Sequence, residues 1–389
     1  MYTFKRIFEY ARCFFLVIIA RIISVFVRPT RKYKDLWIVS ERGTDARDNG
    51  YHFFKYLTTQ HPEICCVYII SKNSPDRPKV AALGRVISYG SLEHYLSFLL
   101  AKVRVSSHIE GYSPDILFFN KFGKFVPSKA KNIFLQHGII KDDIEFCHAD
   151  RTNIDMFVCS ATPEYDYIDK VYGYEKGILK LTGLCRYDNL RKNDTTTRKI
   201  LFMPTWRASL RSCSQRTFCA SEYFKKYNSL LNSSRLSELL KKYDYELVFY
   251  PHYEVQKFLG CFGTDNERVR IADFKNNDVQ QLLIDSDILI TDYSSVYFDY
   301  AYMRKPMVFY QYDEEAFRAQ QYGKGYFDYK RDGFGKVVQN ESEVIEELES
   351  ILKNDLQPTA EYLQKMNSFF KFNDANNCER TYKAILNLL

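Results

Sequence analysis

Short apolar runs alternate with longer helical patterns along most of this chain, and this alternation constrains its fold more than any other feature. The runs are rich in β-branched and aromatic residues, which is typical of buried strands. Strands separated by helices form parallel sheets that are covered by helices. The runs form a first and a second series: Leu36–Ser40, Cys66–Ser71, Lys102–His108, Asn132–Gln136, Asp155–Ser160 and Ile178–Thr182, then Ile200–Met203, Glu246–Tyr250, Arg268–Ile271, Asp287–Thr291 and Met307–Tyr310.

A polar stretch separates the two series. Residues 191–198 read RKNDTTTR, which is typical of an interdomain linker. A chain of 389 residues is also long for one domain. We therefore predict an α/β fold in which two Rossmann-like domains, residues 35–190 and residues 199–389, face a cleft. The second domain would end in helices from about residue 341, and ligands would bind at the carboxyl ends of the strands.

The N-terminal segment is apolar and is surrounded by lysine and arginine residues. Residues 7–28 read IFEYARCFFLVIIARIISVFVR. A spanning helix needs about 20 apolar residues, and Arg21 is costly near the middle of one. No small-residue cleavage site follows Val27. We expect residues 1–34 to form a helix on the cytoplasmic face of the membrane, peripheral or monotopic and attracted to anionic lipid. A core helix and a single span are the alternatives.

The overall charge and the cysteines restrict the class of partner. The net charge is +7, and no arginine-rich block or zinc-ligand spacing accompanies it, so we expect no nucleic-acid partner. Ten cysteines occur without regular spacing. We interpret them as reduced thiols of an intracellular protein.

The segment 285–299 carries the strongest functional signal. The predicted strand Asp287–Thr291 is followed by Asp292 and then by Ser294 and Ser295, where a helical pattern begins. A helix that starts at the carboxyl end of a parallel strand directs unpaired N–H groups and a positive dipole at a ligand. We predict a phosphate or diphosphate site here. The alternative is an ordinary helix that one of the two serines caps.

Polar residues follow other predicted strands as well. His137 precedes Gly138, which permits close approach of the backbone to a ligand, and imidazole is suited to general base catalysis near neutral pH. Arginine side chains at such positions could pair with phosphate oxygens or be solvated. The remaining histidines lack this setting, and we interpret them as structural: His52, His61, His94, His108 and His148.

Together these clusters resemble the CDP-glycerol glycerophosphotransferase family, whose members build and prime teichoic acids and related phosphopolyol polymers. The matching motifs span about residues 36–335. Thr291-Asp-Tyr-Ser-Ser295 with Lys305-Pro306 is the most specific of them. The resemblance implies a glycosyltransferase-B-like fold with the nucleotide mostly on the C-terminal domain.

The resemblance also implies an activity. A glycerol- or ribitol-phosphate would move from a CDP-alcohol donor to a hydroxyl of a lipid-linked, teichoic-acid-type acceptor, with release of CMP. The rivals are a nucleotide-sugar glycosyltransferase of surface polysaccharide synthesis and a non-catalytic binding module.

No Asp-x-Asp motif stands at a strand end, so we expect no metal and no other cofactor. The expected catalytic residues are His137, His252, Asp48 and Glu41, and the expected substrate ligands are Arg186, Asp188, Arg207, Thr205, Asp292, Ser294, Ser295 and Lys141.

Overall fold

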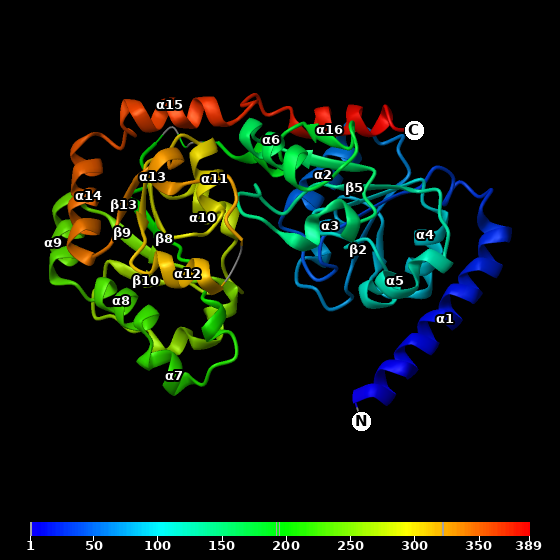
Figure 1. Ribbon diagram of the computed structural model, residues 1–389, viewed down its shortest axis with the longest axis horizontal. Coiled ribbons are helices and arrows are strands. Elements are labelled where there is room, and N and C mark those ends of the chain that lie inside the picture. Colours follow the sequence, from blue (N-terminus) through cyan, green and yellow to red (C-terminus); the bar gives the residue numbers. More distant parts are fainter. Residues whose placement is uncertain (1, 192, 194, 321–322) are drawn as a thin grey trace. The chain divides into compact units, whose positions relative to one another are not determined.

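The chain forms two compact units, each built on one parallel sheet (Figure 1). The computed structural model describes residues 2–191, 193, 195–320 and 323–389. Unit 1 comprises Met1–Ile139, Glu145–Asn189 and Asp374–Leu389, and unit 2 comprises Ile140–Ile144 and Leu190–Asn373. The predicted α/β class with two parallel sheets is confirmed.

Unit 1 contains a seven-stranded sheet in the order β3-β2-β1-β4-β5-β6-β7. All its pairings are parallel, with Ser40 of β1 opposite Ser106 of β4. The chain runs outward from β1 and then crosses to β4, so the strand order reverses between these two strands. The strands are β1 (Trp37–Ser40), β2 (Cys66–Ile70), β3 (Val86–Ser88), β4 (Val103–Ser106), β5 (Lys131–Phe134), β6 (Met156–Cys159) and β7 (Leu179–Leu181).

Unit 2 repeats this plan with six strands in the order β10-β9-β8-β11-β12-β13. All pairings are again parallel, and the order reverses between β8 and β11. The strands are β8 (Lys199–Phe202), β9 (Glu246–Phe249), β10 (Val269–Ile271), β11 (Ile288–Thr291), β12 (Met307–Tyr310) and β13 (Lys336–Val338).

Helices connect the strands within each unit. Those of unit 1 are α1 (Tyr2–Val27), α2 (Asn49–Gln60), α3 (Arg77–Ala81), α4 (Leu92–Leu100), α5 (Ile116–Phe122), α6 (Thr162–Val171) and α16 (Asn377–Leu386). Those of unit 2 are α7 (Gln215–Ala220), α8 (Glu222–Leu231), α9 (Ser234–Tyr243), α10 (Val279–Ile284), α11 (Val296–Tyr302), α12 (Glu314–Gln320), α13 (Tyr329–Asp332), α14 (Glu341–Lys353) and α15 (Ala360–Phe369).

Burial on both faces explains why the strands could be recognised in the sequence. The central strands β1, β4, β11 and β12 are buried at every position. Each predicted strand is present. Among the described strands, β3 and β13 were not predicted; both are edge strands of three residues, as are β7 and β10, which the sequence did predict.

The predicted domain boundaries need correction. Residues 374–389 belong to unit 1 rather than to the C-terminal domain, and residues 140–144 belong to unit 2. The predicted linker is also part of unit 2. The backbone N–H groups of Thr197 and Arg198 donate to the carboxylate of Asp287 at 3.0 and 2.7 Å, which fixes the entry into β8. Two of the linker residues, at positions 192 and 194, lie outside the described part of the chain.

Helix α1 packs along unit 1 through one face. Cys13, Val17 and Ala20 are buried in a cluster that includes residues of α4 and α5. The ring of Phe14 contacts that of Phe118 with a centroid separation of 4.8 Å. The apolar residues of the opposite face are exposed: Ile7, Phe8, Phe15, Ile18, Ile22, Val25 and Phe26. Among the described residues, α1 is the helix that is long and apolar enough to cross a membrane.

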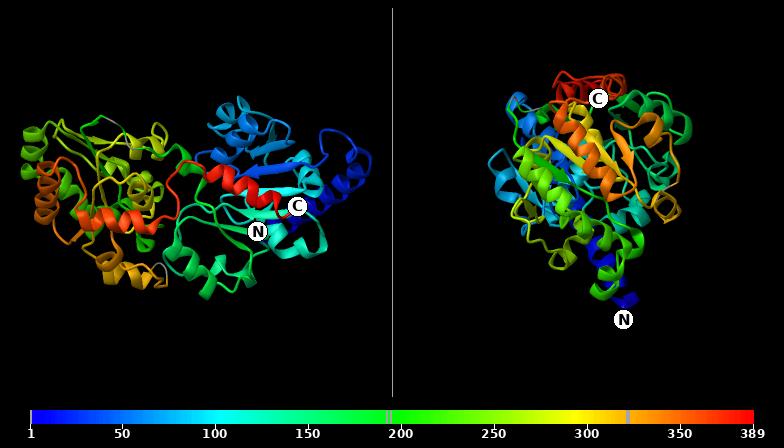
Figure 2. Two further views of the ribbon diagram at one scale, coloured as in Figure 1. Left: turned by 90° about the horizontal axis from the view of Figure 1, so that it is seen from above. Right: turned by 90° about the vertical axis from the view of Figure 1, so that its left-hand side faces the viewer.

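Helix α16 joins unit 1 because a carboxylate holds its N-terminus. Asp188 accepts hydrogen bonds from the backbone N–H groups of Asn377 and Cys378, both at 2.8 Å. Arg380 donates to the backbone carbonyl of Thr182 at 2.9 Å. The red helix therefore lies against the blue and green elements of unit 1 (Figure 2). Asp188 thus serves as the anion at a helix N-terminus, and its predicted contact with substrate stays a prediction.

We predict that Asp188→Ala loosens α16. Loss of a capping carboxylate costs about 0.5–2 kcal/mol, so amide hydrogens of residues 380–386 should exchange faster by mass spectrometry. The matched control is Asn340→Ala, because Asn340 is the N-cap residue of α14 in unit 2 and its side chain accepts from the backbone N–H of Glu343. That variant should raise exchange in α14 only. Unchanged exchange of α16 in Asp188→Ala would contradict the assignment.

Candidate active site

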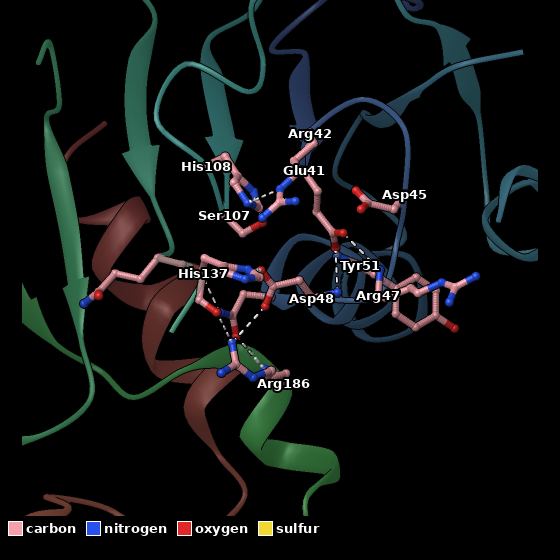
Figure 3. A network of polar contacts seen from close by, with 12 residues as sticks. Glu41, Arg42, Asp45, Arg47, Asp48, Tyr51, Ser107, His108, His137 and Arg186 are labelled. Carbon is pink, nitrogen blue, oxygen red and sulfur yellow. Dashed lines mark hydrogen bonds and ion pairs between the residues drawn. The ribbon is translucent and has the colours of Figure 1, made fainter. Parts of the chain in front are cut away.

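Polar side chains gather at the carboxyl edge of the unit 1 sheet, where the strand order reverses (Figure 3). β1 leads into Glu41, β4 into His108 and β5 into His137, while Asp48 comes from the turn that begins α2. Open parallel sheets bind their ligands at this reversal point. The topology therefore brings these residues together in unit 1.

Asp48 and His137 form a hydrogen-bonded pair. The Oδ2 atom of Asp48 lies 2.6 Å from Nδ1 of His137. The Asp48 side chain is buried, whereas that of His137 is 62% exposed. Since a carboxylate only accepts hydrogen bonds, the proton of the neutral ring lies on Nδ1 and the lone pair on Nε2. The predicted proximity of the two residues is confirmed, and the ring presents a basic nitrogen at the surface of unit 1.

Arg186 holds the other oxygen of Asp48. Its Nη1 atom lies 2.8 Å from Asp48 Oδ1 and also donates to the backbone carbonyl of His137. Burial alone would raise the pKa of Asp48, but the His137 and Arg186 side chains hold that pKa well below its ordinary value. Asp48 therefore stays ionised and can stabilise a positive charge on His137. The predicted contact of Arg186 with phosphate stays a prediction.

Asn49 fastens the backbone around this pair. Its side-chain amide donates to the carbonyl of Gln136 at 2.8 Å, and its side-chain oxygen accepts from the backbone N–H of Arg186 at 3.0 Å. Gln136 itself has a φ of 62°, an uncommon conformation for a residue other than glycine. Such strain persists only where the surroundings enforce it. The buried hydrogen bond from Asn49 to the Gln136 carbonyl helps to hold this conformation immediately before His137.

Glu41 has a structural role, which corrects its prediction as a catalytic residue. Its carboxylate accepts from the backbone N–H groups of Arg47, Asp48 and Tyr51 at 2.8–2.9 Å. It is 1% exposed, and burial together with the charge of Asp48 raises its pKa to about 8. Glu41 therefore caps α2 in place of Asp48, whose side chain makes no capping hydrogen bond. Asp48 is left to hold His137.

The sequence analysis interpreted His108 as structural and assigned no role to Arg42, although Arg42 belongs to the polar cluster Ser40-Glu41-Arg42 after the first strand. His108 Nε2 accepts from Arg42 Nε at 2.8 Å, and the His108 and His137 rings lie 4.8 Å apart between centroids. His108 stands at the end of the predicted strand Lys102–His108. The missing signal was the strand order, because only the adjacency of β1, β4 and β5 brings its ring beside His137.

Asp48, His108 and His137 also offer three possible metal ligands whose atoms lie within 4.8 Å of one another. The guanidinium groups of Arg42 and Arg186 oppose metal binding at these residues. Arg42 occupies the Nε2 lone pair of His108 and Arg186 occupies Oδ1 of Asp48. A divalent cation would have to displace one hydrogen bond and lie close to two positive charges. The metal-free reaction expected from the sequence stays a prediction.

Unit 2 contains a buried ionic network around Arg207 and Asp292. Arg207 donates to Asp313 at 2.7 and 3.0 Å and to Asp292 at 2.9 Å, and both Arg207 and Asp292 are buried. Asp292 also accepts from the backbone N–H groups of Thr205 and Tyr293 at 2.8 and 2.6 Å. These contacts satisfy the charges inside the unit. They fix the ends of β8 and β11, and the predicted contacts of Arg207, Asp292 and Thr205 with substrate stay predictions.

Ser294 and Ser295 follow this network at the start of α11. Ser295 occupies the N-cap position without a side-chain capping hydrogen bond, which does not support the alternative that this serine hydroxyl caps the helix. Ser294 is half-buried and Ser295 is exposed. Within the described part of the chain, neither hydroxyl has a hydrogen-bond partner. The predicted phosphate contact of the two serines stays a prediction.

His252 carries its ring proton on the opposite nitrogen from His137. Its Nδ1 atom accepts from the backbone N–H of Glu254 at 3.3 Å, so the proton of the neutral ring lies on Nε2. The ring stacks at 6.2 Å on that of Trp206, which follows β8. His252 can therefore donate a hydrogen bond to an anion.

Lys141 is buried in unit 2 and forms an ion pair with Asp142. Its Nζ atom lies 5.8 Å from the centroid of the Tyr329 ring. Only three residues separate Lys141 from His137 in the sequence, but residues 140–144 pack with unit 2. Lys141 was predicted as a substrate ligand, but it is a buried cation that pairs with Asp142.

Comparisons with known proteins agree on one family. Residues 21–387 match the family model of CDP-glycerol:poly(glycerophosphate) glycerophosphotransferase. The minor teichoic acid biosynthesis protein GgaB of Bacillus subtilis (strain 168) is 35% identical over 372 residues, which are 91% of this chain and 40% of that protein. The teichoic acid glycerol-phosphate transferase of Staphylococcus aureus (strain NCTC 8325 / PS 47) is 28% identical over 345 residues, 81% of this chain and 83% of that protein.

A solved structure has the same fold. The wall teichoic acid polymerase TagF superimposes with a TM-score of 0.67 at 16% identity, over 100% of both chains. At that identity the likeness establishes the fold alone. The chain spans less than half the length of several relatives that it matches, including GgaB.

We predict the tautomers of three histidines from these contacts. Above the pH at which the rings are protonated, ¹⁵N-resolved NMR spectra should show the proton of His137 and His108 on Nδ1 and that of His252 on Nε2. Asp48→Asn should shift the tautomer of His137 only, since an amide can donate to Nδ1 where a carboxylate cannot. Glu63→Gln, which changes a carboxylate beside His61, is the matched control. An Nε2-protonated His137 in the unaltered protein would contradict the base assignment.

Proposed function

The chain belongs to the CDP-glycerol:poly(glycerophosphate) glycerophosphotransferase family, and we propose from this premise that it transfers a polyol phosphate from a CDP-alcohol to a hydroxyl of a teichoic-acid-type acceptor. CMP is the second product. The observation that carries the proposal is the Asp48–His137 pair, whose exposed ring offers a basic Nε2 atom at the reversal point of the unit 1 sheet.

The chemistry requires a base for the acceptor. Nε2 of His137 takes the proton of the acceptor hydroxyl as its oxygen attacks the distal phosphorus of the donor. A new P–O bond forms, and the P–O bond to CMP breaks with its electron pair on CMP. Asp48 and Arg186 keep the ring oriented, and the Asp48 carboxylate stabilises the imidazolium that results. The proton then leaves His137 to water.

We assign the donor diphosphate to unit 2. His252 offers an N–H group, and Ser294 and Ser295 offer hydroxyls whose hydrogen bonds are not taken by described residues. Phosphoryl transfer depends mainly on positioning and on stabilisation of charge. Arg207 and Asp292 support these groups indirectly, because their buried ion pair fixes the strand ends from which the donor site extends.

We propose that α1 lies in the plane of the membrane on its cytoplasmic face. The helix is fixed to unit 1 through Cys13, Val17 and Ala20, and it would lose this packing if it spanned the bilayer. Its outer face exposes large apolar side chains, including Phe8 and Phe26. The charge complementarity between the flanking arginines and anionic lipid supports the same placement. A lipid-linked acceptor would then reach the active site from the membrane surface.

The test of the transferase is release of CMP. The purified protein is incubated with a teichoic-acid-type acceptor and in turn with CDP-glycerol, CDP-ribitol and a panel of UDP- and GDP-sugars. We expect CMP from at least one CDP-alcohol. His137→Ala and His252→Ala should each lower turnover about 10²–10⁴-fold, the usual contribution of a general acid–base group.

The matched control for these variants is His148→Ala, a histidine of unit 1 that stacks on Tyr172. It should retain turnover. Circular dichroism should show that all three variants are folded. Release of UDP or GDP from a nucleotide sugar, with none of CMP, would instead identify a glycosyltransferase.

The membrane placement is tested with vesicles. Phe15→Asp combined with Phe26→Asp should weaken co-sedimentation with vesicles of mixed neutral and anionic lipid at least tenfold, since charged groups on this face oppose insertion. Leu386→Asp, at an exposed apolar site on α16, should leave binding unchanged. Extraction at high pH should release the unaltered protein. Retention after such extraction, with the N-terminus protected from protease, would show a spanning helix instead.

A further inference from the structure

A pocket of about 790 Å³ lies in unit 1, and neither Asp48 nor His137 lines it. Its walls come from α4, β5, α5, the 3₁₀ turn η1 (Gly123–Phe125) and the loop that precedes β6. Its size is within the range of small-molecule sites. Among the charged residues of its lining, Arg104 of β4 is the one that is buried, with an exposure of 4%. The lining therefore contains a buried cation.

Neutral groups hold this cation. Nε and Nη2 of Arg104 donate to the backbone carbonyl of Phe98 at 3.2 and 2.7 Å, and Nη2 also donates to Ser128 Oγ at 2.5 Å. Nη1 donates to Asn132 Oδ1 at 3.4 Å, so its second N–H group has no acceptor among the described residues. The guanidinium carbon lies 3.6 Å from the centroid of the Phe98 ring. Within the described part of the chain, no carboxylate forms an ion pair with Arg104.

The acids of the pocket are engaged by other groups. The charge of Asp155 acts on Arg104, but the Asp155 carboxylate accepts from Lys131 Nζ at 2.9 Å and from the backbone N–H of Asn132 at 2.8 Å. The other two acids of the lining are Glu110, which lies against the side-chain amide of Asn120, and Asp150, which pairs with Arg151. These acids therefore do not supply a direct counter-ion for Arg104.

Arg104 consequently carries a charge that its surroundings offset only in part. Arginine is rarely buried without a paired anion, because removal of its charge from water costs free energy. Burial lowers the pKa of Arg104 to about 10, which still leaves the guanidinium protonated at neutral pH. Lys124 and Lys129 are exposed in the same lining and add positive charge. An anion in the pocket would supply the missing counter-charge.

Arg104 lies on the face of the sheet against which α1 packs. In the parallel register Arg104 is beside Ile38 of β1, so both side chains point to the same face. Ile38 belongs to the buried cluster that contains Cys13 and Val17 of α1. Helices α4 and α5, which both contribute to the lining of the pocket, also lie beside α1 (Figure 1). The pocket and the proposed membrane helix are therefore on one face of unit 1.

The segment formed by α5 and η1 links α1 to the pocket. The ring of Tyr10 on α1 contacts that of Phe122 with a centroid separation of 5.5 Å. On the same segment Leu117 and Phe125 are 54% and 66% exposed, and Lys124 directly precedes Phe125. Exposed apolar and basic side chains together favour contact with an anionic membrane. A membrane that contacts α1 would therefore also reach this border of the pocket.

We propose that this pocket binds the phosphate headgroup of an anionic membrane lipid, with Arg104 as the phosphate ligand and Lys124 and Lys129 at the entrance. The inference goes beyond the proposed reaction and rests on the proposed membrane placement of α1. A guanidinium forms strong charge-assisted hydrogen bonds with phosphate oxygens. The apolar part of the lining, which includes Phe119 and Val126, suits the carbon atoms attached to that phosphate.

The first test compares two kinds of anionic vesicle. Both consist of a neutral galactolipid with an anionic lipid at equal surface charge: phosphatidylglycerol, which supplies phosphate, or a diacylglycerol succinate, which does not. Arg104→Met removes the guanidinium and keeps an unbranched apolar stem, so it should weaken co-sedimentation with phosphatidylglycerol vesicles about fivefold and with succinate vesicles less than about twofold. Equal losses on both vesicles, or no loss on either, would overturn the proposal.

A second variant gives a result even if Arg104→Met does not fold, which circular dichroism will show. Dihexanoyl phosphatidylglycerol, kept below its micelle concentration, is titrated into the full chain and followed by ³¹P NMR. Lys129→Glu should weaken its binding about fivefold. Lys176→Glu, the same change at an exposed lysine of unit 1 outside the lining, should not. Equal binding by these two variants would overturn the proposal.

Free phosphate is the other source of the same chemistry. Inorganic phosphate titrated in the same way should bind about tenfold more weakly than the short-chain lipid, because it buries no apolar surface. If it binds as tightly, with the same loss in Lys129→Glu, the pocket takes a soluble phosphate and the lipid assignment is wrong.

None of these measurements needs turnover, so they separate this inference from the proposed reaction. If no CDP-alcohol releases CMP but Arg104 still governs the preference for phosphatidylglycerol, the proposed reaction fails and the lipid site remains. If CMP is released and all the variants bind lipid alike, the lipid site alone is wrong.

Discussion

The site of unit 1 depends on a buried carboxylate that is held from both sides. Asp48 contacts His137 through one oxygen and Arg186 through the other, at 2.6 and 2.8 Å. Removal of one partner from a buried charge pair costs several kcal/mol, about 3–5 in measured cases, because the remaining charge is uncompensated. This pairing fixes the ring of His137 and the loop that carries Arg186 together. The orientation of the exposed nitrogen is therefore set from inside the unit.

A division of roles between adjacent residues makes that arrangement possible. Asp48 occupies the N-cap position of α2, where an aspartate would ordinarily accept from the backbone of the first turn. Glu41 accepts those hydrogen bonds instead, including that of Tyr51 at 2.8 Å. Unit 2 uses a similar device, since Asp292 accepts from the backbone N–H of Thr205 and pairs with Arg207. In both units a buried acid fixes residues that follow the strand ends.

The sequence predicted the fold well because buried parallel strands have a distinct composition. It also indicated which strand ends are polar. It could not predict whether a given polar side chain faces a ligand or the interior, since both uses place the same residue types there. Glu41, Asp188 and Arg207 were predicted as functional and are buried or capping residues, whereas His108 was interpreted as structural and lies beside His137. Burial and strand order decide these roles, and neither can be read from a single chain without the sheet topology.

His137 and His252, the two imidazoles of the proposed mechanism, carry their ring protons on different nitrogens because of their immediate neighbours. The neighbour of Nδ1 in His137 is a carboxylate, so Nε2 is left as an acceptor that can take a proton. The neighbour of Nδ1 in His252 is a backbone N–H group, so Nε2 carries a proton and can donate to an oxyanion. Transfer of a phosphoryl group to a hydroxyl needs one group of each kind. A single hydrogen bond at the far side of each ring is therefore enough to give two identical side chains opposite functions.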